Sequence, residues 1–363
     1  MVSMSPGIPS RPVLERPSPG CVSHPCGQPL RVLREGGHLV VEAVHHGARA
    51  RWQLAQQAGE ATLQWQGPCA GEPSAAQQLA VLEAAFTFDP GVRALTLLPP
   101  FAPAASLVAE GLALPAPRGQ QRVHREMFFQ HAPLWLPQAM PPMPLQYTLT
   151  GERRHPRRPV KREGTLYQRH IPWLAGTFSF RSLDIASDLP RFNRWMNDPD
   201  VAQVWQETGD LAKHRRYLEA IAADPHMQAM IACIDGEPFG YFETYWAKEN
   251  RIAPFYDADD HDRGWHVLIG EPSFRGKAFA TAWLTSISHY LFLADPRTRR
   301  IVGEPRADHR QQLRNLDRSG YAKLKEFDFP HKRAMLVMLL RERYFTDTLW
   351  WPRDDEAPVA ARS

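Results

Sequence analysis

A short basic loop at residues 275–280 has the residue types that hold a phosphate-containing ligand. It reads Arg-Gly-Lys-Ala-Phe-Ala, with small side chains at 276, 278 and 280. Small side chains let a ligand approach the backbone and leave its N–H groups free to donate. Phe279, Trp283, Ile287 and Leu291 then recur at helical spacing, which predicts a helix that begins at the loop. The free N–H groups and the dipole of such a helix N-terminus favour an anion such as a pyrophosphate.

By itself the loop also fits an ordinary connection between a strand and a helix. In that interpretation Arg275 and Lys277 are solvated side chains without a ligand. The elements around the loop are needed to distinguish an anion-binding loop from an ordinary connection.

The residues from 165 to 344 predict a mixed α/β unit. Apolar runs alternate with amphipathic stretches, and Asp-Gly-Glu-Pro at 235–238 is a strong hairpin signal. The predicted strands are 178–183, 228–234, 239–246, 265–270, 300–303, 321–329 and 333–340, and the predicted helices are 189–197, 211–222, the helix after the loop, and 311–318.

Length and composition allow two globular domains in 363 residues. A hydrophobic content of 43%, with 11 Trp and 17 Phe, supports packed cores. The net charge of +4 is too small for a broad nucleic-acid surface. No apolar run reaches membrane-spanning length, and the N-terminus lacks the hydrophobic core of a signal peptide. We therefore expect a cytoplasmic protein with no nucleic-acid and no membrane partner, and a homodimer is left open.

The cysteines do not predict a metal site. Cys21, Cys26, Cys69 and Cys233 show no paired spacing, and the Cys-x-x-His-x-Cys sequence that includes His24 lacks a second ligand pair. Cys233 falls inside an apolar strand, which favours a buried inert thiol over a nucleophile.

The 34 prolines are unevenly distributed along the chain, and Pro-rich stretches mark the expected domain boundaries. The basic run RRHPRRPVKR at 153–162 lacks interleaved aromatic residues, which favours a solvated linker over a contact with RNA or an acidic partner. In the first half we expect strands at 38–43, 61–65, 94–98 and 122–130 and a helix at 104–110. We predict a Pro-rich disordered tail at 1–30, a first domain at 31–131, a linker at 132–164, a second domain at 165–345 and a C-terminal tail at 346–363.

The strand, the loop and the helix resemble the acetyl-CoA pyrophosphate loop of the GNAT acyltransferases. The family form is Gln/Arg-x-x-Gly-x-Gly/Ala; Arg275 and Ala280 match it, and Ala278 stands where Gly is usual. The predicted element order of the second half is also the GNAT order. The resemblance implies an α/β (α+β) GNAT fold, with a central mixed, mostly antiparallel sheet flanked by helices.

The two halves of the chain resemble each other in layout. Residues 93–129 and residues 299–339 each predict a strand, a short helix, a Gly, a strand, a turn and a strand. The first half has no basic small-residue loop before a helix. We therefore expect tandem GNAT-like halves, of which the N-terminal copy is degenerate.

Further motifs resemble the siderophore-biosynthesis branch of the GNAT family. They lie at 195–205 (WMNDPDVAQVW), 241–246 (YFETYW), 256–259 (YDAD), 262–266 (DRGWH) and 304–308 (EPRAD). Together these motifs cover most of the second half. At 309 this chain has His where the branch usually has Asn.

The resemblance implies a catalytic pair at His266 and Asp308. A histidine with a pKa near neutrality suits a general base for an attacking amine, and Asp308 would orient the imidazole or contact the substrate nitrogen. Each residue also has a structural interpretation. His266 could be a core histidine bonded to Asp262 or to a carbonyl, and Asp308 could be a helix N-cap.

Other site residues are expected around this pair. The backbone N–H groups of Leu268 or Ile269 would stabilise an oxyanion. Trp205, Trp246 and Tyr256 would line the substrate channel, although aromatic residues at such positions are more often packing residues. The predicted cofactor-binding residues are Leu268, Ile269, Arg275, Gly276, Lys277, Ala278, Phe279 and Ala280.

The predicted function is an N-acyltransferase that uses acetyl-CoA, or another acyl-CoA, without a metal. Its acceptor would be a small N-hydroxy-amino acid, an N-hydroxylated lysine or ornithine, and the product a siderophore hydroxamate. A second interpretation keeps the fold and changes the acceptor to an aminoglycoside, a polyamine or a protein amine, because the acidic residues at 257–262 would suit a polycation. A third is a CoA-binding protein without catalysis.

Overall fold

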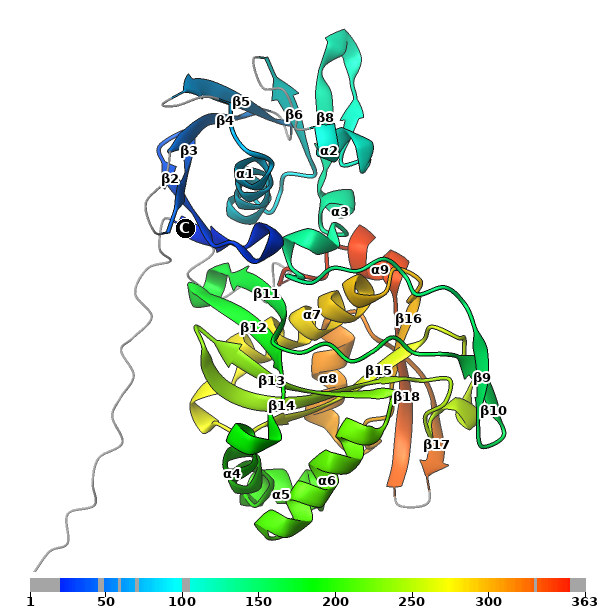
Figure 1. Cartoon of the computed structure of the whole chain (residues 1–363). Coiled ribbons are helices and arrows are strands. Elements are labelled where there is room, and N and C mark those ends of the chain that lie inside the picture. The colour runs from blue at the N-terminus through cyan, green and yellow to red at the C-terminus, as the bar shows by residue number, and fades with distance from the viewer. Residues whose placement is uncertain are drawn as a thin grey trace, which may run out of the picture.

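The computed structural model describes residues 20–44, 49–57, 60–68, 72–99, 105–329 and 332–352. Within these residues the chain forms two units, each built on an eight-stranded sheet (Figure 1). In the described residues, no helix is both long and apolar enough to span a membrane.

The first sheet has the strand order β1-β2-β3-β4-β5-β6-β8-β7. Its strands are β1 (Gly20–Ser23), β2 (Leu30–Glu35), β3 (His38–Ala43), β4 (Ala50–Gln57), β5 (Glu60–Pro68), β6 (Ala94–Leu98), β7 (Ala113–Pro115) and β8 (Gln121–His124). The helices of this unit are α1 (Ala75–Phe88), α2 (Ala105–Ala109) and α3 (Arg125–Phe128), with short 3-10 turns η1 (Pro25–Gly27) and η2 (Pro117–Gly119).

The second sheet has the order β11-β12-β13-β14-β15-β16-β18-β17, which repeats the first. Its strands are β11 (Thr165–Ile171), β12 (Gly176–Ser182), β13 (Met227–Ile234), β14 (Glu237–Trp246), β15 (Arg263–Ile269), β16 (Arg300–Gly303), β17 (Ala322–Phe329) and β18 (Lys332–Leu340). Its helices are α4 (Ile185–Met196), α5 (Pro199–Trp205), α6 (Leu211–Ala223), α7 (Lys277–Ala294), α8 (Arg310–Arg318) and α9 (Arg341–Thr346), with 3-10 turns η4 (Pro172–Leu174), η5 (Ala253–Phe255) and η6 (Pro272–Phe274).

The repeat extends to strand direction and to the crossover helices. Each sheet is antiparallel except for one parallel pair, β5–β6 in the first and β15–β16 in the second. A parallel pair needs a crossover connection, and α1 and α7 supply it in the two units. The expected tandem GNAT-like halves are therefore confirmed.

The halves differ where the second one carries extra helices. β2 and β3 are joined by a tight turn at residues 36–37, whereas α4, α5 and α6 lie between β12 and β13. These three helices cover one face of the second sheet, and α7 and α8 lie on the other face (Figure 1). The first half therefore lacks one of the two helical layers that enclose the centre of the second half.

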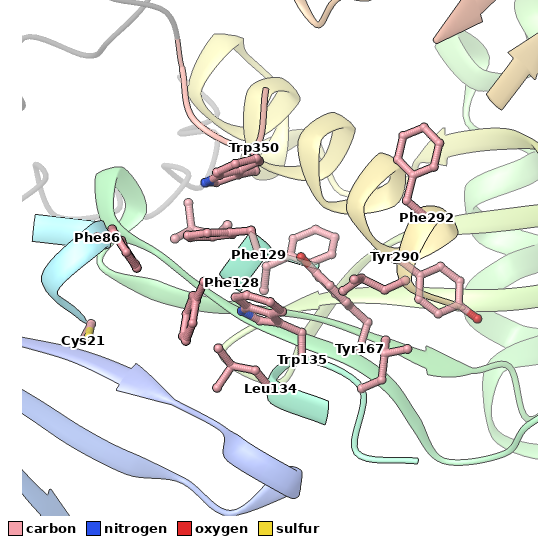
Figure 2. Close-up of a cluster of buried hydrophobic side chains, with 14 of the residues drawn as sticks. Cys21, Phe86, Phe128, Phe129, Leu134, Trp135, Tyr167, Tyr290, Phe292 and Trp350 are labelled. Atoms are coloured by element: carbon pink, nitrogen blue, oxygen red, sulfur yellow. The ribbon is translucent and has the colours of Figure 1, made fainter. Parts of the chain in front are cut away.

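Aromatic side chains join the two units into one core at the seam (Figure 2). The ring of Phe129 from the first unit stacks on Trp350 at 4.3 Å and on Trp135 at 5.0 Å. His289 of α7 bonds to the Phe129 carbonyl at 2.7 Å and to the Tyr167 hydroxyl at 3.0 Å. Trp350 is buried in this core. The start of the expected C-terminal tail, residues 346–352, is therefore packed on the protein.

The expected disordered tail at 1–30 also differs from the structure. Residues 1–19 and Cys69 lie outside the described residues, but Cys21 is buried in β1, which pairs with β2 and forms the edge of the first sheet. Residues 20–23 are ordered by backbone pairing with β2, which the Pro-rich composition of the segment does not predict.

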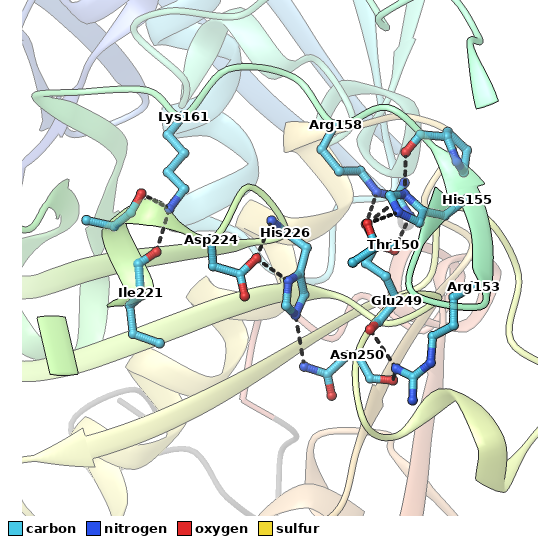
Figure 3. A network of polar contacts seen from close by, with 12 residues as sticks. Thr150, Arg153, His155, Arg158, Lys161, Ile221, Asp224, His226, Glu249 and Asn250 are labelled. Atoms are coloured by element: carbon cyan, nitrogen blue, oxygen red, sulfur yellow. Dashed lines mark hydrogen bonds and ion pairs between the residues drawn. The ribbon is translucent and has the colours of Figure 1, made fainter. Parts of the chain in front are cut away.

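The expected solvated linker at 132–164 is ordered and packs on the second unit. It contains η3 (Ala132–Leu134) and a hairpin of β9 (Tyr147–Thr150) and β10 (Arg153–Pro156). Arg158 pairs with Glu249, and Lys161 donates to the carbonyls of Ile221 and Ala222 at the end of α6 (Figure 3). We call residues 147–161 the strap. Three of its basic residues, Arg153, Arg158 and Lys161, contact the second unit.

Candidate active site

A gap between β15 and β16 is the centre of the site. The two strands pair in parallel at only two positions, Arg263 with Ile301 and Gly264 with Val302, and they separate after that. β15 stays paired with β14 along its whole length. The carboxyl-terminal part of β15 therefore has one open edge.

A cavity of about 780 Å³ passes through this gap. It is lined by side chains from α6 on one face of the sheet and from α8 on the other, so it connects the two faces. Its lining residues are Val204, Trp205, Gln206, Glu207, Tyr217, Ile221, His226, Met227, Glu243, Glu249, Asn250, Arg251, Trp265, His266, Val267, Gly303, Glu304, Pro305, Arg306, His309, Gln312, Leu316, Tyr321, Lys332 and Val337.

His266 lies at the gap between two buried carboxylates. It is opposite Glu243 across the β14–β15 pairing, and its Nδ1 is 2.9 Å from Glu243 Oε2. Its Nε2 is 3.1 Å from Oε1 of Glu304, the residue that follows β16. Ionised carboxylates only accept hydrogen bonds, so the imidazole donates from both nitrogens and is protonated.

Three tyrosines satisfy the remaining carboxylate oxygens. Tyr217 and Tyr241 donate to Glu243 Oε1 at 2.5 and 2.8 Å, and Tyr245 donates to Glu304 Oε2 at 2.8 Å. Buried carboxylates are costly unless they are paired and hydrogen-bonded, and here every oxygen has a donor.

The charges of this cluster shift the pKa values of its members. Burial lowers the pKa of His266, but the hydrogen bonds to Glu243 and Glu304 outweigh burial and raise it to about 9. Burial raises the pKa of Glu304, but the hydrogen bond and the charge of His266 lower it to about 2. His266 is therefore an imidazolium at neutral pH in the free protein, and not the neutral base that the sequence suggests.

Asp308 does not orient the imidazole. Its carboxylate is exposed and binds the Arg306 side chain at 3.0 and 2.8 Å, and this hydrogen bonding lowers the pKa of Asp308. Glu304 holds the position next to His266 that was expected for Asp308. The N-cap of α8 is His309, whose Nδ1 accepts from Gln312 N, and not Asp308. A contact between Asp308 and the substrate nitrogen stays a prediction.

The basic loop lies at the N-terminus of α7, as predicted. Gly276 is the N-cap with φ of 109°, a backbone conformation that favours glycine, and a Cβ there would meet no atom within 4 Å. The first helical hydrogen bond is from Ala280 N to Gly276 O, so the N–H groups of residues 277–279 precede the helix ladder. Lys277 is exposed. This N-terminus has the shape and donors of an anion site.

Two side chains and one backbone carbonyl of the loop have structural partners. Arg275 binds Asp200 at 2.7 Å and the Ile269 carbonyl at 3.2 Å, so its charge is partly neutralised. The Ala278 carbonyl accepts from Trp173, and Phe279 packs on Phe274.

The open edge of β15 favours Ile269 over Leu268 as the oxyanion donor. The Trp205 ring nitrogen donates to the Val267 carbonyl, and Arg275 donates to the Ile269 carbonyl. Along a strand, the N–H and C=O of one residue point to the same side and alternate with those of the next residue. Val267 and Ile269 thus face the gap, and Leu268 faces β14.

Of the three predicted channel aromatics, only Trp205 lines the cavity. Its ring lies 6.4 Å from that of His266. Trp246 is packed between the guanidinium groups of Arg158 and Arg263. Tyr256 donates to Asp262 at 2.9 Å and lies outside the cavity lining. For these two aromatics the packing interpretation applies.

Two carboxylates of the acidic loop have partners within the protein, whereas Asp257 and Asp259 are exposed. Asp262 is buried against Arg300 at 2.7 Å, and Asp260 accepts from Tyr147 of the strap. Two of the four carboxylates that suggested a polycationic acceptor are therefore engaged in the fold.

Sequence reasoning missed the two carboxylates beside His266. Glu243 and Glu304 lie inside motifs that were noted, but neither was selected. A glutamate in an otherwise apolar strand such as 239–246 is an available signal, because Glu is almost never fully buried without a partner. Cys233 is buried in β13 and burial raises the pKa of its thiol, in agreement with an inert residue.

Comparisons with known proteins agree with this architecture. The model of an acetyltransferase (GNAT) domain matches residues 184–329. The N(6)-hydroxylysine O-acetyltransferase of Escherichia coli is 41% identical over 227 residues, which are 62% of this chain and 72% of that protein. The chain belongs to the GNAT acyltransferase family.

Two fungal members of this family are also similar. This GNAT acyltransferase is 41% identical to the N(5)-hydroxyornithine:cis-anhydromevalonyl coenzyme A-N(5)-transacylase of Beauveria bassiana, over 61% of the chain and 57% of that protein. It is 43% identical to a hydroxyornithine transacylase of Ajellomyces capsulatus, over 58% of the chain and 50% of that protein. The matched region thus covers 57% and 50% of the length of these two fungal relatives.

Proposed function

We propose that this GNAT acyltransferase transfers an acyl group, acetyl by default, from acyl-CoA to the hydroxylated side-chain nitrogen of lysine or ornithine. The product would be the hydroxamate of a siderophore. The observation that carries the proposal is the cavity through the β15–β16 gap, which brings His266 to the centre of a passage between the two faces. The names of the similar proteins support hydroxylysine and hydroxyornithine as acceptors. A cytoplasmic location and a homodimer stay predictions from the sequence.

For the acyl-CoA, the N-terminus of α7 would bind the pyrophosphate. The N–H groups of Lys277, Ala278 and Phe279 are available there, and the open space above Gly276 admits a close approach of the ligand. Lys277 adds a positive charge in solvent. Arg275 would hold the loop to the N-terminus of α5 through Asp200.

In the reaction, the neutral nitrogen of the hydroxylamine attacks the thioester carbonyl carbon. A C–N bond forms, the carbonyl electrons move onto oxygen, and the N–H of Ile269 on the open edge would stabilise that charge. Collapse then breaks the C–S bond, and the electron pair leaves on sulfur. The nitrogen must lose one proton and the sulfur must gain one.

The His266–Glu304 pair can carry both protons. A pKa of about 9 for His266 is close to the value of about 8.5 for a thiol, so the imidazolium is matched to protonate the leaving thiolate. Once His266 has lost its proton, Glu304 loses its hydrogen-bonded cation, and the remaining cationic neighbours, such as Arg251 at 3.7 Å, are farther away, so its pKa rises. Glu304 can then accept the nitrogen proton and return it to the imidazole at 3.1 Å.

The test is the variant His266→Ala with acetyl-CoA and N6-hydroxylysine. We expect kcat to fall by about 10²–10⁴-fold with little change in acetyl-CoA affinity, because the proton donor is lost and the loop is intact. Hydroxamate is detected by its ferric complex and by mass. His261→Ala, which changes a histidine outside the cavity lining, is the control. Full turnover by His266→Ala would remove the assigned role.

A further inference from the structure

Two cations, Arg251 and Lys332, line the cavity near Glu304. Arg251 follows β14, and Lys332 begins β18, the strand that β16 pairs with. Both line the cavity, and both lie against the face of one phenyl ring, Phe329, at 5.6 Å. The ring fixes the place of the two charges without neutralising them.

Arg251 is adjacent to the reacting centre. Its Nη2 is 3.7 Å from Glu304 Oε1, the same oxygen that accepts from His266 Nε2 at 3.1 Å. The guanidinium and the imidazole are therefore separated by one oxygen atom. The Arg251 side chain is 52% exposed, so it has room to turn toward a ligand.

Lys332 is less solvated, and within the described part of the chain its ammonium forms no ion pair. Among the described residues, the contact recorded for its ammonium is the Phe329 ring, and no hydrogen-bond acceptor lies within reach. Burial lowers the pKa of Lys332, and the nearby charges of Arg251 and Arg306 lower it further, against the attraction of Glu304. The charges of Arg251, Arg306 and Glu304 therefore all act on the Lys332 ammonium.

The local charges leave a positive surplus. Arg306 is neutralised by Asp308 through two hydrogen bonds. Glu243 and Glu304 together balance His266 and leave one negative charge, which Arg251 and Lys332 share. One cationic charge is therefore uncompensated beside the proton-transfer pair, which suits a ligand with one negative charge.

We propose that Arg251 and Lys332 form a subsite for the α-carboxylate of the acceptor amino acid. The proposal rests on the function proposed above and deepens it. A guanidinium can bind a carboxylate through two parallel hydrogen bonds, and an ammonium adds a point charge. With the carboxylate held there, the side chain reaches toward His266. The enzyme then selects amino acids over the corresponding diamines.

The experiment compares two acceptors that differ only in the carboxylate, N6-hydroxylysine and N-hydroxycadaverine, with saturating acetyl-CoA. For the native enzyme we expect kcat/KM to be at least about 100-fold higher for hydroxylysine, because a site that binds a polar group rejects an analogue without it. Arg251→Met and Lys332→Met should each lower kcat/KM for hydroxylysine by about tenfold or more. Each variant should lower the value for hydroxycadaverine at least about fivefold less than the value for hydroxylysine, because only hydroxylysine carries the carboxylate.

Arg333→Met is the matched control, since Arg333 is next to Lys332 but is exposed and bound to Glu326. Arg251→Lys should recover part of the hydroxylysine activity. An unchanged KM for acetyl-CoA and an unchanged melting temperature show that each variant is folded.

Equal turnover of the two acceptors by the native enzyme would overturn the subsite while the acyltransferase function stands. Equal losses on both acceptors in the variants would likewise overturn it, because the two residues would then serve the cofactor or the fold. No turnover of these two acceptors or of N5-hydroxyornithine would overturn the proposed function, and the subsite with it.

Discussion

His266 carries its proton because two buried carboxylates hold it from both sides. The sequence suggested a base with a pKa near the working pH, and the structure has an imidazolium with a pKa of about 9. The difference matters for the direction of proton transfer. A charged His266 gives a proton to the leaving group first and takes one from the acceptor afterwards.

The pH dependence of kcat separates these two orders. If the imidazolium is the active form, kcat falls as pH rises through about 9. If a neutral base is required, kcat rises over the same range instead. Glu304→Gln removes a charge that raises the pKa of His266, so its basic limb should move to lower pH by about one unit. Glu326→Gln, at an exposed position on β17, should leave the limb in place.

The same shifts predict a pH window for stability. The pKa of His266 is raised from 6.5 to about 9, so its contribution is complete below about pH 6.5 and is lost as pH rises through 9. The pKa of Glu304 is lowered from 4.5 to about 2, so its contribution is present above about pH 4.5 and is lost toward pH 2.

Residue types could be predicted at the site, but their partners could not. His266 and the loop at 275–280 are local in sequence and were found. Glu243 and Glu304 reach His266 only through the pairing of β14 with β15 and the position of β16, and strand register is not a local property. The sequence also does not show that the Asp308 side chain binds Arg306 and not the imidazole.

At the scale of elements, the start of α7 depends on one glycine. Gly276→Ala should raise the KM for acetyl-CoA by about tenfold, because a side chain at φ of 109° costs about 1–3 kcal/mol and the loop would adopt another conformation. The Cβ itself would meet no atom within 4 Å, so the effect is conformational. Gly91→Ala is the control, as its Cβ also meets no atom and its φ is ordinary. Equal KM values for the two variants would contradict the role of the loop.

The strap is the second element on which the site depends. The side chains of Arg158 and Glu249 are both 2% exposed, and the Arg158 guanidinium binds both carboxylate oxygens of Glu249 at 2.5 Å (Figure 3). Arg153 donates to the carbonyls of Glu249 and Asn250. Glu249, Asn250 and the adjacent Arg251 line the cavity. The strap, which was expected to be part of a linker, therefore supports the cavity wall formed by residues 249–251.

Arg158→Ala should lower the free energy of unfolding by about 3–5 kcal/mol, because it leaves the buried Glu249 carboxylate without its cation. Urea titration measures the loss. Arg157→Ala, which changes the exposed neighbour, should have almost no effect. The double variant Arg158→Met/Glu249→Gln should be more stable than Arg158→Ala, and a double variant of equal or lower stability would argue against the uncompensated charge as the cause.

Several elements could be predicted from their patterns, and others could not. The strands at 38–43, 94–98 and 300–303 agree with β3, β6 and β16 to the residue. α1 was missed because buried residues occur all around it, so it has no amphipathic stripe. The predicted strand at 122–130 is β8 followed by α3, since apolar residues such as Met127 and Phe128 fit a short helix equally well.

At the scale of the whole molecule, the two halves form one folded body. Phe129 and Trp135 are close in the sequence, and they stack at the seam with Trp350 from the C-terminal end of the described chain. His289 joins them from the crossover helix of the second half. The N-terminal half repeats the sheet but has no basic loop at the start of α1, which instead begins with a capping box at Ser74 and Gln77. It packs against the second half through this seam.

The most direct test is the release of free CoA from acetyl-CoA with four acceptors: N6-hydroxylysine, N5-hydroxyornithine, lysine and ornithine. Hydroxylation lowers the basicity of the nitrogen, so the hydroxylated acceptors arrive neutral and ready to attack, and we predict rapid turnover with at least one of them and little with lysine or ornithine. Turnover of the unhydroxylated amines at the same rate, or of none of the four despite measurable CoA binding, would contradict acyl transfer to an N-hydroxylated side chain.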